Sequence, residues 1–430
     1  MKVKRAVVLS GGGARGAYEA GVLRYVLEEL PRRLGRAPHF DVICGTSVGA
    51  LHACFLAATA GQGPHVGSRL ADLWRSFKIG EVLPVSAREL LRWPRRLVGL
   101  ARVGSELRSD QPPDRLYGLF NTEALERIVL RSIPWSEIRR NIVAGRVEAL
   151  SVTATQISTG RAFVFIENRD GPVEAWPRDR SVVAQAARIL PLHALASAAI
   201  PMLFPAVRIG SSYYADGGLR LNTPILPAMR LGADRVLVIG LQYRPTPEEE
   251  EARIPQIVEA YGNPLFLFGK VLNAILLDHV SADLRRMQLV NEILTDGREL
   301  YGPDFLDRIN ALSMRKRGHR LRLIDDLLIR PSEDLGMMAG RLINDGRVDV
   351  RLSPFLRLFL RSFGTSTSES DLLSYLLFDA AYAAPLVELG FNDARAQEER
   401  FLRFFSDEPM RDRGEGGARC AETSSRGSGG

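Results

Sequence analysis

Cysteine and long apolar runs are both scarce in this chain. Its three cysteines, Cys44, Cys54 and Cys420, form no disulfide framework and no C-x-x-C pair of the kind found in metal sites. A reducing compartment is therefore expected. No run of about 20 apolar residues predicts a transmembrane helix, and the apolar stretch at residues 6–9 is too short for the core of a signal peptide. We expect a cytoplasmic protein that touches membranes only peripherally.

The chain also lacks a concentrated block of basic residues. Its formal net charge of +7 comes from arginines scattered along 430 residues, which favours a solvated basic surface over a nucleic-acid patch. An apolar content of 46% and a charged content of 25% are those of a globular protein with a sizeable core. The length allows one large α/β domain with an appendage, or two domains. There is no internal repeat, and nothing indicates an oligomeric state.

A buried-strand pattern opens the chain and is followed at once by glycines. Residues 5–10 are apolar as in a parallel core strand, and residues 17–30 have a helical pattern that Pro31 is expected to end. Between them lies Gly11-Gly-Gly-Ala-Arg-Gly16, a loop whose backbone N–H groups could bind an anion at a helix N-terminus. Three interpretations are open: an oxyanion hole, a dinucleotide-binding G-x-G-x-x-G loop, or a tight turn. We favour the first, because the next strand does not end in the acidic residue that a ribose requires.

That next strand, at residues 40–44, leads into Gly45-Thr-Ser-Val-Gly49 and then a helical pattern over residues 48–60. Strand, sharp turn and helix in this order are what a nucleophile elbow requires, with Ser47 at its tip. The small residues at positions 45 and 49 leave room for the turn. Taken alone, the pattern also fits a glycine-rich connection with an idle serine.

A serine nucleophile needs a base, and the sequence offers two kinds. Asp216, before Gly217 and Gly218, is either a turn residue or a carboxylate presented at the end of a hairpin strand. In the second case its pKa must be raised for it to accept a proton. A Ser–Asp–His triad with His279 is the other option. His52 lies about 140° round the helix from Ser47 and points away; His193 and His319 have no expected neighbour to orient them.

The remaining chain supplies fewer signals. Residues 86–97 combine basic residues, leucines and Trp93, and predict a flap, a membrane-facing helix or an ordinary surface helix. Consecutive strands are expected at residues 147–155 and 162–167, and further strands at residues 235–241 and 320–330. Residues 263–295 and 346–405 have helical patterns. Residues 407–430 are rich in Gly, Ser and Arg, which predicts disorder.

Four motifs, in their order and spacing, resemble those of the patatin-like phospholipases. They are the loop at residues 11–16, the elbow at residues 45–49, the Ala-Ser-Ala-Ala-Ile-Pro-Met-Leu-Phe-Pro segment at residues 196–205, and Asp216-Gly-Gly218. The resemblance runs from about residue 3 to residue 240 and extends more loosely over the later helices. Gly218 stands where many members carry Ala, a tolerated variant.

The resemblance implies a three-layer α/β/α fold with a mainly parallel central sheet and a C-terminal helical extension. We accordingly expect a catalytic domain over residues 1–345, with its core motifs at residues 5–240 and a helical insertion at about residues 246–318. A helical extension would occupy residues 346–406, and a disordered tail residues 407–430.

The resemblance also implies a Ser–Asp dyad without a required histidine, with Ser47 as nucleophile and Asp216 as base. The oxyanion hole would comprise Gly11, Gly12, Gly13, Arg15, Gly16 and Val48, with Gly45, Gly49, Gly217 and Gly218 supporting the motifs. The family cleaves acyl esters of phospholipids, lysophospholipids and neutral lipids, commonly without a metal. We therefore expect a lipid acyl hydrolase that needs no cofactor and meets its substrate at a membrane surface. The alternatives are a non-catalytic membrane- or partner-binding module and a dinucleotide-binding oxidoreductase.

Overall fold

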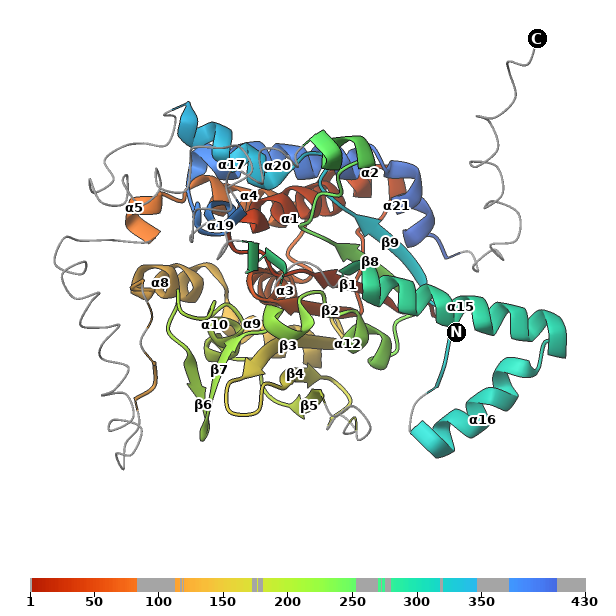
Figure 1. The fold of residues 1–430 in the computed structure, drawn as a ribbon. Helices are drawn as coiled ribbons and strands as arrows, with labels where there is room; N and C mark the ends of the chain where they lie inside the picture. Colours follow the sequence, from red (N-terminus) through yellow and green to blue (C-terminus); the bar gives the residue numbers. More distant parts are fainter. Residues whose placement is uncertain are drawn as a thin grey trace, which may run out of the picture.

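One sheet of nine strands forms the centre of the molecule (Figure 1). The computed structural model describes residues 2–82, 113–116, 118, 120–171, 176, 181–252, 270–271, 273–274, 280–317, 320–345 and 371–407. Seven strands follow the order β5-β4-β3-β2-β1-β8-β9, and β7 pairs with both β3 and β6. The strands are β1 (Arg5–Leu9), β2 (Val42–Thr46), β3 (Ala149–Gln156), β4 (Ala162–Asn168), β5 (Val182–Ala186), β6 (Val207–Ile209), β7 (Ser212–Asp216), β8 (Arg235–Ile239) and β9 (Asp325–Ile329).

The strands pair mostly in parallel, as predicted. β1 lies parallel to β2 and β8, β2 to β3, and β8 to β9. The pairs β3–β4, β3–β7 and β6–β7 are antiparallel. The late strand expected at residues 320–330 is confirmed as β9, and the strands expected at residues 147–155 and 162–167 are β3 and β4. The predicted α/β fold with a mainly parallel sheet is therefore confirmed.

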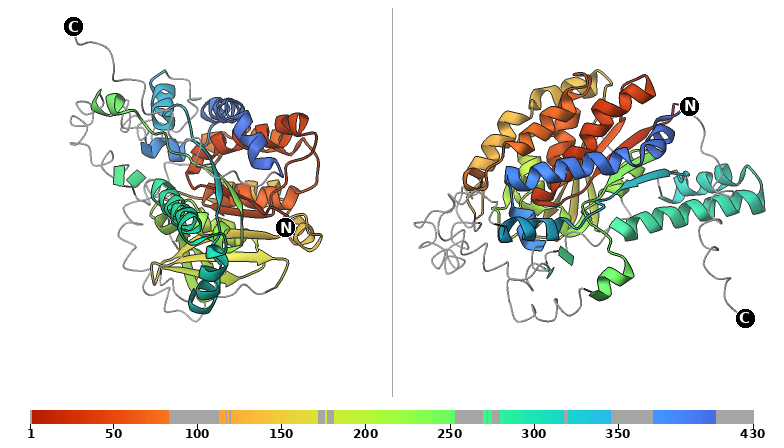
Figure 2. Two further views of the ribbon diagram at one scale, coloured as in Figure 1. Left: turned by 90° about the vertical axis from the view of Figure 1, so that its right-hand side faces the viewer. Right: turned by 90° about the horizontal axis from the view of Figure 1, so that it is seen from above.

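Helices cover both faces of the sheet because its strands are apolar on both sides. Val7, Leu9 and Ile43 face one apolar core, and their neighbours in the chain face a second. α3 (Val48–Thr59), α9 (Trp135–Val143) and α10 (Pro191–Ser197) pack on the first face, and α12 (Ile225–Arg230) packs on the second. α15 (Val280–Tyr301) and α16 (Phe305–Arg317) form a helical pair that extends outward beside α12 (Figures 1 and 2).

A second helical layer lies over α3. It contains α1 (Gly16–Arg24), α4 (Val66–Arg75), α17 (Leu335–Asn344), α19 (Asp371–Leu376), α20 (Ala380–Arg395) and α21 (Glu398–Phe405). α20 lies along α1 (Figure 2, right). Gly21 and Gly390 allow this approach, because a Cβ at either would overlap a backbone carbonyl of the other helix. The C-terminal helices thus pack directly on the first helix of the chain.

The expectation that Pro31 ends the first helix is wrong. After α1 the chain makes one wide π turn (Tyr25–Glu29) and continues as α2 (Leu30–Leu34). Pro31 lies in the first turn of α2, where its missing N–H costs little. The predicted segment at residues 86–97 lies outside the described residues, and so do residues 408–430 of the tail predicted at residues 407–430.

Candidate active site

Ser47 occupies a sharp turn between β2 and α3. Its backbone has a φ of 55° and a ψ of −126°, and it is one of two non-glycine residues with positive φ in the described chain. Such a conformation is strained and persists only where the surroundings enforce it. Gly45 and Gly49 are required by packing, because a Cβ at Gly45 would overlap the carbonyl of Gly49, and one at Gly49 would overlap the carbonyl of Leu9.

The sheet brings Asp216 to the same point. β3 extends beyond the end of β2, so its residue Thr153 pairs with Thr46 at the end of β2, while the next residue, Ala154, pairs with Asp216 at the end of β7. β2 and β7 therefore meet end to end alongside β3. At their junction Ser47 Oγ donates a hydrogen bond of 2.6 Å to Asp216 Oδ2.

The Asp216 carboxylate is buried, with 1% of its surface exposed. Its second oxygen, Oδ1, accepts a 2.7 Å hydrogen bond from the N–H of Gly218. Burial raises the pKa of Asp216 to about 7, and the hydrogen bonds from Ser47 and Gly218 act in the opposite direction. Gly217 lets the chain approach β3 closely, because a Cβ there would overlap the carbonyl of Thr153. Burial thus brings the pKa of this carboxylate close to neutral pH.

Ser197 holds the backbone turn at Ser47 in place and was not predicted from the sequence. Its Oγ accepts a 2.8 Å hydrogen bond from the N–H of Ser47 and donates one of 2.5 Å to the carbonyl of Thr153. One buried hydroxyl therefore ties the strained turn to β3. Ser197 belongs to the small-residue segment at residues 196–205, and that motif was the only signal that could have suggested it.

The glycine loop lies beside Ser47. Both backbone polar groups of Gly11 bond to Asn222. The Gly11 N–H donates to the Asn222 carbonyl at 3.1 Å, and the Gly11 carbonyl accepts from the Asn222 side-chain amide at 3.2 Å. Within the described chain the N–H groups of Gly12, Gly13 and Val48 have no acceptor. Gly13 and Val48 line the same pocket as Ser47. Unpaired backbone donors next to a serine hydroxyl could hold an oxyanion.

The side chain of Arg15 and the N–H of Gly16 have partners other than Ser47. The Arg15 guanidinium is buried against α19, where it donates to Ser374 Oγ at 2.7 Å and to Asp371 Oδ1 at 3.0 Å and stacks 4.6 Å from the centre of the Tyr375 ring. The N–H of Gly16 bonds within the turn that begins the helix. The structure therefore joins Arg15 to the C-terminal helices, whereas Gly13 lines the same pocket as Ser47.

Two of the candidate histidines are bound away from Ser47. His52 is buried, and its ring nitrogens contact Glu19 Oε2 at 2.8 Å and Trp74 Nε1 at 2.9 Å. Because an indole N–H only donates, Nε2 of His52 accepts and Nδ1 carries the proton. His193 is also buried, and burial lowers its pKa to about 4. His279 and His319 lie outside the described residues.

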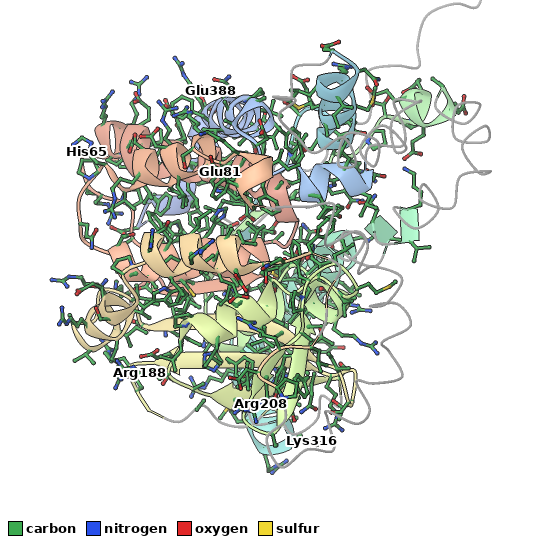
Figure 3. The ribbon with its side chains drawn as sticks, turned by 90° about the vertical axis from the view of Figure 1, so that its left-hand side faces the viewer. His65, Glu81, Arg188, Arg208, Lys316 and Glu388 are labelled. Carbon is green, nitrogen blue, oxygen red and sulfur yellow. The ribbon has the colours of Figure 1, made fainter. Side chains whose placement is uncertain are left out.

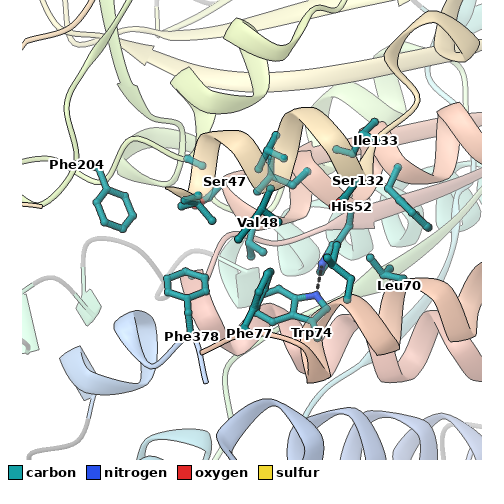
Figure 4. A pocket seen from close by; sticks show the side chains of 18 of the residues that line it. Ser47, Val48, His52, Leu70, Trp74, Phe77, Ser132, Ile133, Phe204 and Phe378 are labelled. Atoms are coloured by element: carbon teal, nitrogen blue, oxygen red, sulfur yellow. Dashed lines mark hydrogen bonds between the residues drawn. The ribbon is translucent and has the colours of Figure 1, made fainter. Parts of the chain in front are cut away.

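An apolar pocket of about 680 Å³, including its open mouth, begins at Ser47 (Figure 4). We call it the apolar pocket. Trp74, Phe77, Phe204 and Phe378 are among the side chains that line it, and Phe378 comes from the C-terminal helical region. A flexible hydrocarbon chain fits such walls.

The described residues hold no cluster of three or more His, Cys, Asp or Glu side chains suited to a metal ion. Among the same residues, no helix combines the length and apolar character needed to cross a membrane.

The fold and the Ser47–Asp216 pair define an α/β protein with a serine at a strained strand-to-helix turn, beside a buried carboxylate, at one end of a mostly parallel sheet. The model of the patatin-like phospholipase family matches residues 7–229, which include the glycine loop, Ser47 and Asp216, and the chain belongs to this family.

Two curated relatives have the same printed name. The chain is 30% identical over 221 residues to a "cGAMP-activated phospholipase" of Pseudomonas aeruginosa and 26% identical over 235 residues to one of Escherichia coli. Each alignment covers 51% of this chain and 53% of the relative. The chain thus spans about half the length of the curated relatives it matches.

Solved structures with a related arrangement are more distant in sequence. Human GIVD cytosolic phospholipase A2, in complex with methyl gamma-linolenyl fluorophosphonate, is 13% identical, with a TM-score of 0.39 over 94% of this chain and 58% of that one. VipD from Legionella pneumophila is 14% identical, with a TM-score of 0.32 over 92% of both chains.

Proposed function

We propose that the chain is a lipid acyl hydrolase that cleaves carboxylic esters of phospholipids or lysophospholipids through an acyl-enzyme on Ser47. The observation that carries the proposal is the 2.6 Å hydrogen bond from Ser47, which lines the apolar pocket, to a buried Asp216. A serine hydroxyl needs an adjacent base to attack an ester, and a carboxylate whose pKa is near 7 can accept its proton at neutral pH. Membership of the family supports the choice of a lipid ester.

The proposed cycle uses groups that already meet at the elbow. Ser47 Oγ attacks the ester carbonyl while Asp216 accepts the hydroxyl proton, and the N–H groups of Gly12, Gly13 and Val48 stabilise the oxyanion. Asp216 returns the proton to the departing alcohol. It then deprotonates the water that attacks the acyl-enzyme, and Ser47 is regenerated with release of the fatty acid. The apolar pocket holds the acyl chain throughout.

The decisive variant is Ser47→Ala. We expect it to abolish turnover of p-nitrophenyl esters and covalent labelling by a fluorophosphonate, because both require the Ser47 hydroxyl. The measurement is colourimetric turnover together with mass spectrometry of the labelled peptide. Labelling that persists at another serine would reject the assignment. Unchanged lipid binding with no wild-type turnover would favour the non-catalytic membrane-binding module.

His279→Gln tests whether the reaction needs a histidine in addition to Asp216. A dyad requires no histidine, so this variant should keep nearly wild-type turnover. A loss of about 10³-fold or more would revive the Ser–Asp–His triad.

One feature weighs against the dinucleotide alternative. The backbone N–H and carbonyl of Gly11 are both bound to Asn222, so the first glycine of the G-x-G-x-x-G pattern has no free donor for a pyrophosphate. Binding of NAD(P)H, detected as a raised melting temperature, would restore that alternative. Cytoplasmic location and peripheral membrane contact form part of the same proposal.

A further inference from the structure

A buried carboxylate connects the two ends of the glycine loop. The pairings of β1 with both neighbouring strands end at Leu9, and the next N–H group, that of Ser10, donates a 2.8 Å hydrogen bond to Glu19 Oε1. Glu19 lies in the first turn of α1, the helix that follows the loop. Both residues are fully buried. The bond therefore joins the residue before the loop to the helix after it.

Two aromatic side chains hold the other oxygen of Glu19. Its Oε2 lies 2.8 Å from His52 Nδ1, and His52 Nε2 accepts a 2.9 Å hydrogen bond from Trp74 Nε1 (Figure 4). Because Nε2 accepts, the neutral ring carries its proton on Nδ1 and donates it to Glu19. Both oxygens of Glu19 thus accept hydrogen bonds, as an ionised carboxylate does.

These contacts favour a charge at a position where burial opposes it. Burial raises the pKa of Glu19, while the hydrogen bonds from His52 and Ser10 act in the opposite direction. The N-terminal end of α1 also favours a negative charge. Without the carboxylate, the buried N–H of Ser10 would lose its acceptor, which is strongly unfavourable. Ser10 should then shift toward another acceptor, and the loop with it.

Such a shift matters because the candidate oxyanion donors follow closely. Gly12 and Gly13 lie two and three residues after Ser10, and a misplacement of about 1 Å near reacting atoms can lower a rate by about 100-fold. Other segments also touch the loop: Ser10 Oγ lies 2.9 Å from Thr223 Oγ1, and the Tyr375 carbonyl packs against Gly13. Glu19 adds a contact from the loop's own helix.

We propose that Glu19, oriented by His52 and Trp74, is a positioning residue that fixes the glycine loop so that its N–H groups face the ester carbonyl at Ser47. The inference rests on the proposed function, since it assigns the oxyanion to Gly12 and Gly13. Glu19 acts through Ser10 and the loop. Its replacement should therefore change kcat more than the binding of the ester.

Glu19→Met removes both acceptor oxygens at similar side-chain length. With p-nitrophenyl acetate, whose short acyl group limits the contribution of the apolar pocket, kcat should fall about 10- to 100-fold while KM changes by less than about threefold. Rates are divided by the fraction of chains that a fluorophosphonate labels, so unfolded protein does not count. An unchanged kcat per labelled chain would overturn the proposal.

Glu19→Gln keeps the side-chain shape and tests the aromatic contacts. Its one oxygen can accept from Ser10, but its NH2 group then faces His52 Nδ1. The ring can accept there only with its proton on Nε2, where that proton meets the Trp74 N–H. Glu19→Gln should lower kcat about tenfold alone and less than about threefold in a chain that also carries Trp74→Phe, which removes the conflict. Equal effects in the two backgrounds would contradict the proposal.

Two other carboxylates provide matched controls. Glu28, in the π turn after α1, likewise accepts from a backbone N–H and a second donor, both of Ser68. Glu388, labelled at the top of Figure 3, lies on the exposed surface of α20 and pairs with Arg24 and Arg75. Glu28→Gln and Glu388→Gln remove the same charge away from the loop. Each should leave kcat and KM within about twofold of the wild type.

Hydrogen exchange separates this proposal from the proposed function, because it needs no turnover. In Glu19→Met, amides of residues 10–16 should exchange about tenfold faster, while those of β8 keep their wild-type rates. That rise without any Ser47-dependent turnover in the unmodified chain would reject the acyl hydrolase and retain Glu19 as the residue that orders the loop. Ser47-dependent turnover with wild-type exchange and kcat in Glu19→Met would reject the role of Glu19 alone.

Discussion

At the scale of single residues, burial sets the pKa of Asp216, on which its proposed role as base depends. An exposed aspartate would be ionised and too weak a base at neutral pH, whereas this carboxylate is 1% exposed and its pKa is raised to about 7. Only the ionised form can accept the proton of Ser47. Activity should therefore be high above pH 7 and fall as Asp216 becomes protonated.

We expect kcat/KM for a p-nitrophenyl ester to fall about tenfold per pH unit on the acid side of an apparent pKa of about 7. Because the ester itself does not titrate, the profile reports the free enzyme. The measurement is initial rate against pH at low substrate concentration. A profile that stays flat down to about pH 5 would show that the base has an ordinary carboxylate pKa.

The raised pKa of Asp216 also makes the free energy of unfolding depend on pH. Burial raises the pKa of Asp216 from 3.8 to about 7, so between these values the folded state keeps a proton that the unfolded chain releases. The stabilising contribution is complete below pH 3.8 and is lost as the pH rises to about 7. Asp216→Asn has no such proton. Its melting temperature, relative to the wild type, should rise between about pH 4 and about pH 8.

Local sequence indicated Ser47 and Asp216 because each lies in a glycine motif with its own turn chemistry. It gave no account of Ser197, whose bond to Ser47 joins positions 150 residues apart. Arg15 was grouped with the oxyanion hole because it lies in the glycine loop. Its partners Ser374 and Asp371 lie 359 and 356 positions later in the chain, and only the folded structure shows that it faces them.

At the scale of elements, strands buried on both faces were the easiest to predict. β1 and β8, which are buried throughout, were expected from their aliphatic runs, and so was β9, a half-buried strand that ends in Leu-Leu-Ile. β5 (Val182–Ala186) was missed because it is a short, half-exposed strand at the edge of the sheet, and Gln185 interrupts its apolar residues. The π turn after α1 was missed because a helix before a proline normally ends there.

The crossing of α1 and α20 makes a prediction about small residues. Gly390→Ala should destabilise the fold by about 1–3 kcal/mol, because its Cβ would overlap the Tyr18 carbonyl of α1 and neither backbone can move freely. The measurement is urea unfolding followed by circular dichroism. Gly80→Ala is the matched control. No atom lies within 4 Å of a Cβ at Gly80 in α5 (Ile79–Val82), so stability should change by less than about 1 kcal/mol. Equal effects of the two substitutions would contradict this account.

At the scale of the whole molecule, the family motifs and the C-terminal helices form one structure. The family match ends at residue 229, but α20 covers α1, and Phe378 lines the apolar pocket. Tyr375 also packs against the glycine loop, since a Cβ at Gly13 would overlap its carbonyl. Although it lies outside the family match, the segment at residues 371–407 contributes to the candidate site.

A chain that ends at residue 345 should therefore fail to fold, while one that ends at residue 407 should melt at the temperature of the full chain. The shorter chain exposes Tyr18 and Tyr25, which are fully buried. It also removes the carbonyl groups of Phe404 and Ser406, which accept hydrogen bonds from the largely buried Arg5 side chain. Lost apolar burial and an unpaired buried cation both oppose folding. Thermal melts and fluorophosphonate labelling of the full chain and of the chains that end at residues 345 and 407 test this prediction. If the chain that ends at residue 345 melts cooperatively and is still labelled, the first 345 residues form an independent catalytic domain.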